Sequence, residues 1–149
     1  MNTEIISIVD SSLDLDGQKI ISYPHSAMEL HITLPSHKNK NPRVVRAYAT
    51  VDLIKNTAIR ADSFPELIKV KVNKDSVLPQ KISSDAAIEA AKEKIISWVK
   101  RRYRLIITPK IEVVEIVPIY YHPFVISKDK KGRPIMVNVV RDTAERWKG

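Results

Sequence analysis

The sequence predicts an α+β fold in which one main helix, at about residues 84–102, packs on an antiparallel β-sheet. Three observations predict it. Only one stretch has apolar residues at helical spacing over several turns, and a long run rich in β-branched and aromatic residues follows that stretch at 111–126. Shorter segments before the helix alternate apolar and polar residues with a period of two. We expect about six to eight strands, forming one sheet or two related sub-sheets.

The part of the chain before the helix predicts strands separated by polar turns. The clearest alternation places Met28, Leu30, Ile32 and Leu34 on one face, with polar residues between them. Lys55 and Asn56 are typical turn residues. The predicted strands are 3–9, 28–34, 45–53, 57–61 and 67–73.

The helix is predicted from both its periodicity and its ends. Five apolar residues fall on one face: Ile88, Ala91, Ile95, Trp98 and Val99. Ser83 or Ser84 can accept hydrogen bonds from the free N–H groups of the first turn, and Asp85 suits the positive end of the helix dipole. Basic residues at 100–102 suit the negative end.

The run after the helix predicts a strand at 111–126 that two prolines interrupt. Pro118 and Pro123 have no N–H group to donate to a neighbouring strand. We therefore expect either two strand pieces with a bulge or bend, or a strand at the edge of a sheet.

A polar segment at 127–134, with Gly132, predicts a turn into a return strand at 135–140. The helix and this unequal hairpin form the predicted core unit. The apolar stripe of the helix is expected to lie on the segments near Ile111 and Val137.

Composition is that of a folded protein with a basic surface. Of 149 residues, 44% are hydrophobic and 28% are charged, and the net charge is +8. The charge is uneven, at −2 over 1–41, +4 over 42–84 and +6 over 85–149. We expect one domain over 1–149, with 1–80 as a β-rich sub-module and 81–149 as a helix with a β-hairpin. An excess of basic over acidic residues favours an acidic partner.

The location of the protein is predicted from features that the sequence lacks. It has no cysteine, no apolar run of about 20 residues, and no basic segment followed by an apolar one at its start. Membrane spanning is therefore not expected, and the cytoplasm is the expected location.

Residues 81–149 resemble a known type of domain. The S-x-D-A-A-I-x-A-A start of the helix, the following hairpin and the turn at Asp142 and Thr143 are similar to PepSY-type domains and, more loosely, to cystatin-like α+β domains of uncharacterised bacterial or archaeal proteins. Ala144 stands where the usual glycine follows that turn. The resemblance implies a non-catalytic interaction or regulatory module without active-site residues. Residues 51–62 and 139–149 also share a T-A-x-R sequence, which would indicate two related hairpins.

Catalytic, cofactor and metal motifs are not recognisable. The three glycines, at 17, 132 and 149, lie far apart, whereas phosphate-binding loops and the nucleophile elbow need glycines close together. Glu112 and Glu115 are three apart on a predicted strand and so face opposite sides. His25, His31 and His37 are spaced by six, but Pro24 and Pro35 are expected to break the strand between them, so we predict no metal site and no cofactor.

Basic and aromatic residues are the best functional candidates. Trp98 is expected in the core. One of Tyr120 and Tyr121 must face outward from the strand and is a candidate protein contact. The candidate residues for an anionic partner are Lys100, Arg101, Arg102 and Arg104 at the helix end, and Lys128, Lys130, Lys131 and Arg133 at the hairpin tip. The loop at 38–43 adds Lys38, Lys40 and Arg43.

These features lead to three hypotheses. The first is a non-catalytic binding or regulatory module that acts through contacts with another protein or with itself. The second is a nucleic-acid-binding protein that uses the basic helix end and the hairpin, and the third is a small enzyme of unrecognised chemistry.

Overall fold

The computed structural model describes residues 2–10, 20–35, 43–128, 130–138 and 143–146. These residues form an α+β fold with eight strands, one α-helix and one short 3-10 helix. The chain forms two compact units. Unit 1 is Met1–Pro24, Pro65–Pro79 and Tyr120–Gly149, and unit 2 is His25–Phe64 and Gln80–Ile119. Unit 1 thus consists of three separate stretches of the chain, and unit 2 of two.

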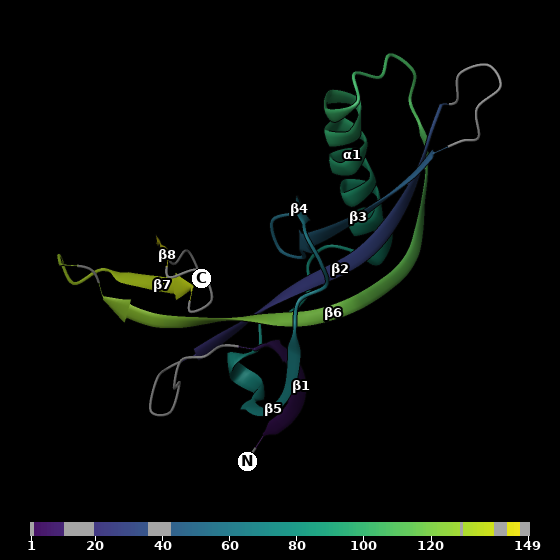
Figure 1. The fold of residues 1–149 in the computed structure, drawn as a ribbon. Coiled ribbons are helices and arrows are strands. Elements are labelled where there is room, and N and C mark those ends of the chain that lie inside the picture. Colours follow the sequence, from purple (N-terminus) through teal and green to yellow (C-terminus); the bar gives the residue numbers. More distant parts are fainter. Residues whose placement is uncertain (1, 11–19, 36–42, 129, 139–142, 147–149) are drawn as a thin grey trace. The chain divides into compact units, whose positions relative to one another are not determined.

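Unit 2 is a sheet with a helix on one face. Its strands lie in the order β4-β3-β2-β6, with parts of β2 and β6 belonging to unit 1. The helix α1 packs against β3 and β4 (Figure 1). The elements are β2 (Ile20–Leu34), β3 (Arg43–Asp52), β4 (Thr57–Ala61), α1 (Ser84–Arg102) and β6 (Lys110–Lys128).

The helix has the boundaries that the sequence predicts. The Ser83 hydroxyl accepts a hydrogen bond from the Ala86 N–H at 3.1 Å, so Ser83 rather than Ser84 is the N-cap. Asp85 lies in the first turn and Lys100–Arg102 form the last one, as the helix dipole favours.

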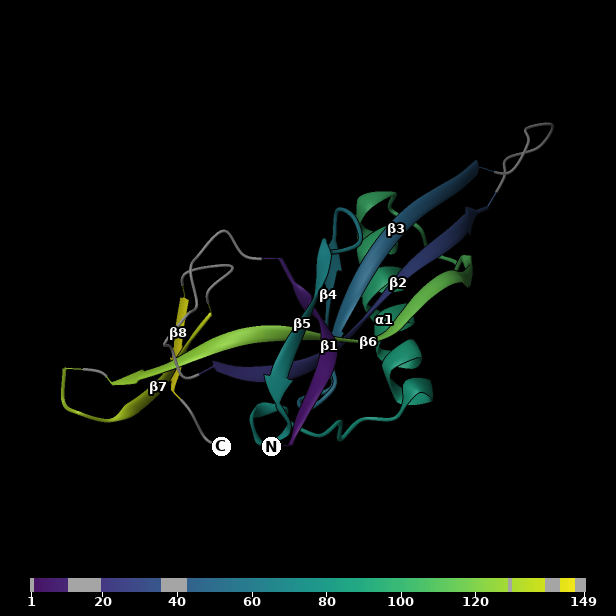
Figure 2. The ribbon, with the colours of Figure 1, turned by 90° about the horizontal axis from the view of Figure 1, so that it is seen from below.

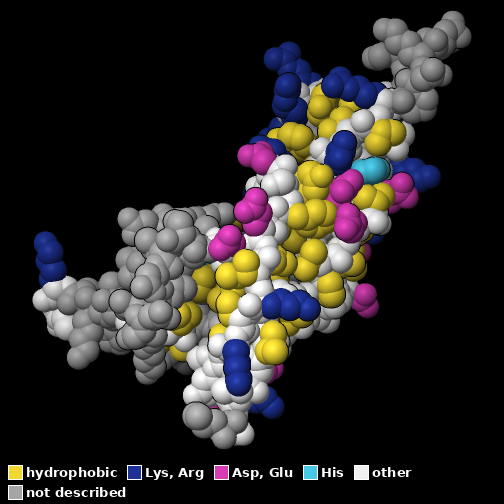
Figure 3. Space-filling model, turned by 60° about the horizontal axis from the view of Figure 1, so that its bottom comes forward, with side chains coloured by type: hydrophobic (Ala, Val, Ile, Leu, Met, Phe, Trp, Pro, Cys, Tyr) yellow, Lys and Arg dark blue, Asp and Glu magenta, His cyan; other side chains and the backbone are white. Residues whose placement is uncertain are grey.

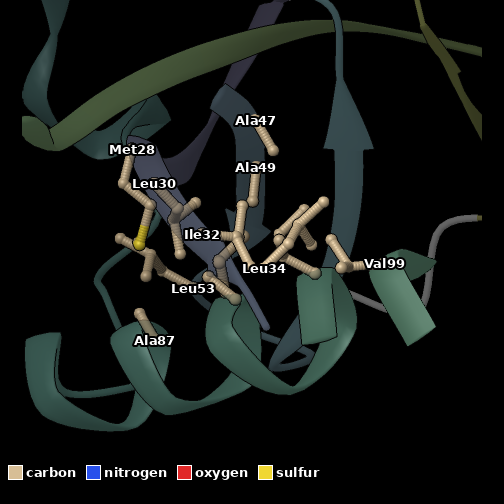
Figure 4. Packing of buried hydrophobic residues seen from close by; sticks show 12 residues of the cluster. Met28, Leu30, Ile32, Leu34, Ala47, Ala49, Leu53, Ala87 and Val99 are labelled. Carbon is tan, nitrogen blue, oxygen red and sulfur yellow. The ribbon is translucent and has the colours of Figure 1, made fainter. Parts of the chain in front are cut away.

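The core of unit 2 lies between α1 and the sheet. Met28, Leu30 and Ile32 on β2 are fully buried, and so are Ala49 and Val51 on β3. In Figure 4 the labelled side chains of Met28, Leu30, Ile32 and Ala49 point toward the helix. The helix contributes the buried residues Ala87, Ala91, Ile95 and Val99. The apolar residues that alternate along β2 and β3 therefore pack directly against the apolar stripe of the helix.

The turn between β3 and β4 lies where the sequence predicts it. The Asp52 carboxylate accepts hydrogen bonds from the N–H groups of Ile54 and Lys55, both at 2.8 Å. Asn56 has a φ of 55°, a left-handed conformation that asparagine adopts more readily than most residues. Together these residues form the tight turn that starts β4 at Thr57.

Unit 1 is built of short strands around the end of β6. In it β1 (Thr3–Val9) pairs antiparallel with β5 (Leu67–Asn73) and parallel with β6, where Ile8 lies opposite Tyr121. The 3-10 helix η1 (Lys74–Ser76) follows β5. At its far end β6 pairs antiparallel with β7 (Pro134–Asn138), which pairs with β8 (Thr143–Arg146). The buried core includes Ile6, Ile8, Tyr23, Tyr120 and Phe124.

Three predictions about the strands require correction. The sheet is not antiparallel throughout, because β1 runs parallel to β6. Pro24 does not break its strand, since β2 is continuous from Ile20 to Leu34. β6 is one strand that lies between β2 and β1, although it contains Pro118 and Pro123. Whether a proline is tolerated in a strand depends on which neighbour lies opposite it, and a single sequence does not show this.

The helix packs elsewhere than predicted. Ile111 lies at the edge of the helix core, but Val137 belongs to unit 1. The surface under α1 is instead formed by buried residues of β2 and β3, together with Ala58 of β4.

The two T-A-x-R sequences occupy equivalent positions in two hairpins. Thr57 starts β4 and Thr143 starts β8. Ala58 lies opposite Val51, and Ala144 lies opposite Val137, so both hairpins have the same spacing between paired residues. That the two hairpins are related stays a prediction.

Candidate functional site

A basic cluster lies at the end of α1 in unit 2. Lys100, Arg101 and Arg102 form the last helical turn, and Arg104 follows with a left-handed φ of 52°. Tyr103 is the C-cap residue. The structure adds Arg43 of β3, whose guanidinium carbon lies 5.4 Å from the centre of the Tyr103 ring, while that of Arg102 lies 5.5 Å from it. Two arginines from separate elements thus contact one aromatic ring.

The second predicted basic group lies in unit 1. Lys130, Lys131 and Arg133 are exposed around the turn at Gly132, which has a φ of 77°. The side chain of Lys128 and the residues Lys38 and Lys40 lie outside the described part of the chain. Convergence of the hairpin tip with the helix end stays a prediction.

The tyrosine pair divides between the inside and the surface of unit 1. Tyr120 is only 3% exposed, so Tyr121 is the partly exposed member. Burial, and secondarily the charge of Glu4, raise the pKa of the Tyr121 hydroxyl above its ordinary value of 10.0.

The face of the unit 2 sheet that points away from α1 carries exposed apolar side chains, which sequence reasoning missed. They are Val44 on β3, Ile59 on β4, and Val114 and Ile116 on β6, with exposed fractions of 57%, 36%, 44% and 37%. We call these four residues the outer face. They alternate with core residues of the same strands, such as Val45 and Val113.

The outer face is visible from the side opposite the helix. In Figure 2 the strands β3, β2 and β6 lie in front of α1. In Figure 3 hydrophobic side chains run along this sheet between charged ones. The neighbouring polar groups include His31 and Glu29, whose Nε2 and Oε2 atoms lie 2.7 Å apart. The alternation at 45–53 indicated a strand with two different faces, but not that its second face would be partly apolar.

A hollow of about 400 Å³ opens on unit 2 where β4 ends. It is lined by Arg46, Ala47, Tyr48, Arg60, Ala61, Asp62 and Trp98. The guanidinium carbon of Arg60 lies 4.5 Å from the centre of the Trp98 ring, and its Nη1 atom lies 3.6 Å from Asp62 Oδ1. Trp98, predicted as core, is partly buried against the core and turns its ring toward Arg60.

A larger and shallower hollow of about 600 Å³ lies between α1 and β4. The charged residues that line it are Glu89, Glu93 and Lys94 on exposed helix positions. Thr57 and Ser97 provide the hydroxyl groups of its lining.

His25 and His31 share the continuous strand β2, but the described residues contain no group of three or more metal-ligating side chains. His37 lies outside those residues.

None of the helices in the described part of the chain combines the length and the apolar character needed to cross a membrane.

Comparisons of the chain with protein-family models, with curated proteins and with solved structures found no match.

Proposed function

We propose that this chain is a non-catalytic binding or regulatory module that acts through protein contacts made by the outer face of unit 2. One observation carries the proposal: four large apolar side chains are exposed on the sheet face that α1 leaves uncovered. A sheet face that only meets water normally carries polar side chains at such positions. On the outer face Glu29 and His31 of β2 lie between the apolar residues of β3 and those of β6. Apolar side chains mixed with polar ones are typical of a protein interface, which is about as apolar as other protein surface.

The proposal agrees with the role that the resemblance of residues 81–149 to PepSY-type and cystatin-like domains implies. Those are modules that act by binding. The partner is another protein or a second copy of the chain, because an apolar sheet face can be covered by either.

The experiment places a photo-cross-linking amino acid at Val114 in the cells that naturally make the protein. We expect a discrete adduct, whose cross-linked peptides are identified by mass spectrometry, and we expect Ile116→Lys to abolish it. The control places the same amino acid at Glu93, which is exposed on α1. The proposal fails if Val114 gives no adduct, or if both positions give the same products.

A second candidate role is nucleic-acid binding, favoured by the contacts of Arg43 and Arg102 with Tyr103. Arginines beside an aromatic ring can neutralise phosphates while the ring stacks on a base. We expect retention of a single-stranded oligonucleotide that weakens steeply with salt and falls when Arg101, Arg102 and Arg104 become alanine. The matched control replaces the exposed Lys69, Lys71 and Lys74 by alanine, which removes the same number of positive charges. Absence of binding at low salt would exclude this role.

A further inference from the structure

The strand β3 has an open edge. It pairs with β2 along its whole length, from Arg43 to Asp52. On its other side it pairs with β4 only from Tyr48 to Asp52, because β4 ends at Ala61. Among the described residues, Arg43–Ala47 therefore have a strand neighbour on one side only. We call this five-residue segment the open edge.

An open edge presents a row of N–H and C=O groups that can pair with a further strand. Pairing of this kind is a common mode of peptide recognition, in which main-chain hydrogen bonds give affinity and nearby side chains give specificity. The side chains around this edge therefore determine which peptide it suits.

Arginines surround the open edge. The hollow where β4 ends contributes Arg46 and Arg60, and the far end of the edge has Arg43 and Arg102 beside Tyr103. In the hollow the only carboxylate is that of Asp62, whose side chain is fully exposed. The charge favours an acidic ligand.

Arginines lie on both faces of the sheet beside the position that an added strand would occupy. Arg43 lies on the helix side, where Tyr103 is, and Arg46 has the opposite orientation because it is three residues further along β3. Successive side chains of an added strand alternate between these faces. Carboxylates on either side of the bound chain would thus have an arginine partner.

Arg60 is partly held in place before any ligand binds. Its guanidinium group lies over the Trp98 ring, which limits its freedom, while its N–H groups remain able to donate. Less conformational entropy is then lost when a carboxylate binds.

We propose that the open edge of β3 binds an extended acidic peptide segment of a partner protein as an added strand, with its carboxylates on Arg43, Arg46 and Arg60. This inference rests on the proposed role in protein contacts. It names a neighbouring surface, which shares Val44 with the outer face, and the chemistry of its partner. The competing explanation is that the arginines only protect the edge from pairing with other chains.

The probe is a synthetic peptide of about eight residues in which pairs of glutamates alternate with pairs of threonines, long enough to cover the edge. This pattern places carboxylates on both sides of the extended chain. A matched peptide has the same sequence with all backbone amides methylated, which keeps its charge and removes the N–H donors from both of its edges. Binding is followed by Trp98 fluorescence in a Trp147→Phe background, since the chain has two tryptophans. Hydrogen exchange then locates the protected amides.

We expect the acidic peptide to bind and to slow amide exchange at Arg43–Ala47. Arg46→Glu and Arg60→Glu should each weaken binding by about tenfold, the loss of one charge-assisted hydrogen bond. Lys94→Glu, on an exposed helix position, makes the same charge change as a control and should leave binding unchanged.

Three results would overturn the inference: equal binding of the methylated peptide, which would show charge attraction alone; protection outside the open edge; or binding of a single-stranded oligonucleotide but not of the peptide. The cross-linking at Val114 does not involve the open edge, so failure of this inference and failure of the proposed function are distinguishable.

Discussion

Two buried serines on β2 differ in their hydrogen bonding and should respond differently to substitution. Ser26 donates to the Val117 carbonyl at 3.1 Å, whereas the Ser22 hydroxyl has no hydrogen-bond partner among the described residues. Ser26→Ala should lower the free energy of unfolding by about 1 kcal/mol, and Ser22→Ala should leave it unchanged or raise it. Urea unfolding monitored by circular dichroism measures both. Equal losses would show that the Ser22 hydroxyl does have a partner.

Tyr121 should make the stability of unit 1 sensitive to alkaline pH. Because burial raises its pKa in the folded state, the unfolded chain loses this proton first as the pH rises above the ordinary value of 10.0. Stability is therefore unaffected below that pH and falls as the pH rises toward the folded-state pKa. We expect Tyr121→Phe to lose less stability between neutral pH and a pH above 10.0 than the parent does. The check is urea unfolding at both pH values.

The control for this measurement is Tyr103→Phe, which removes a hydroxyl at the end of α1. An identical pH dependence in the parent and in Tyr121→Phe would contradict the prediction.

At the scale of single elements, α1 depends on its N-terminal cap. The Ser83 hydroxyl satisfies one of the free N–H groups of the first turn. Ser83→Ala should lower the free energy of unfolding by about 1 kcal/mol. Ser84→Ala, one residue further along, is the matched control and should change it much less. Denaturant unfolding of the two variants tests this. A larger loss of unfolding free energy for Ser84→Ala would show that Ser83 is not the N-cap.

The elements that the sequence predicts accurately are those that local signals determine. Strands 3–9, 57–61 and 67–73 and the helix 84–102 have the predicted boundaries, because alternation, turn residues and caps all lie within them. The first part of β2 and the continuity of β6 were not predicted, since prolines in strands depend on distant neighbours.

The candidate surfaces were predictable only in part for the same reason. The basic helix end is visible in the sequence, but its contact with Arg43 joins segments 60 residues apart, and the contact of Arg60 with Trp98 joins β4 to α1. The outer face and the open edge follow from strand pairing, which single-sequence patterns do not specify.

At the scale of the whole molecule, stability should depend strongly on the helix core of unit 2. Ile95 is fully buried between α1 and the sheet. Ile95→Ala should cost about 2–5 kcal/mol, a large share of the roughly 5–15 kcal/mol that stabilises a typical protein. Ile96→Ala removes the same atoms from the next, partly exposed position and should cost less. Thermal or urea unfolding compares them, and equal losses would contradict the assigned core.

The four crossings between the units have a consequence for how the protein can change over time. Each crossing, after residues 24, 64, 79 and 119, has a proline at it or one residue away: Pro24, Pro65, Pro79 and Pro118. Since both units are assembled from separated stretches, no single cut releases either of them whole. Exchange of gene segments could not transfer one unit to another protein, and the two must be inherited together.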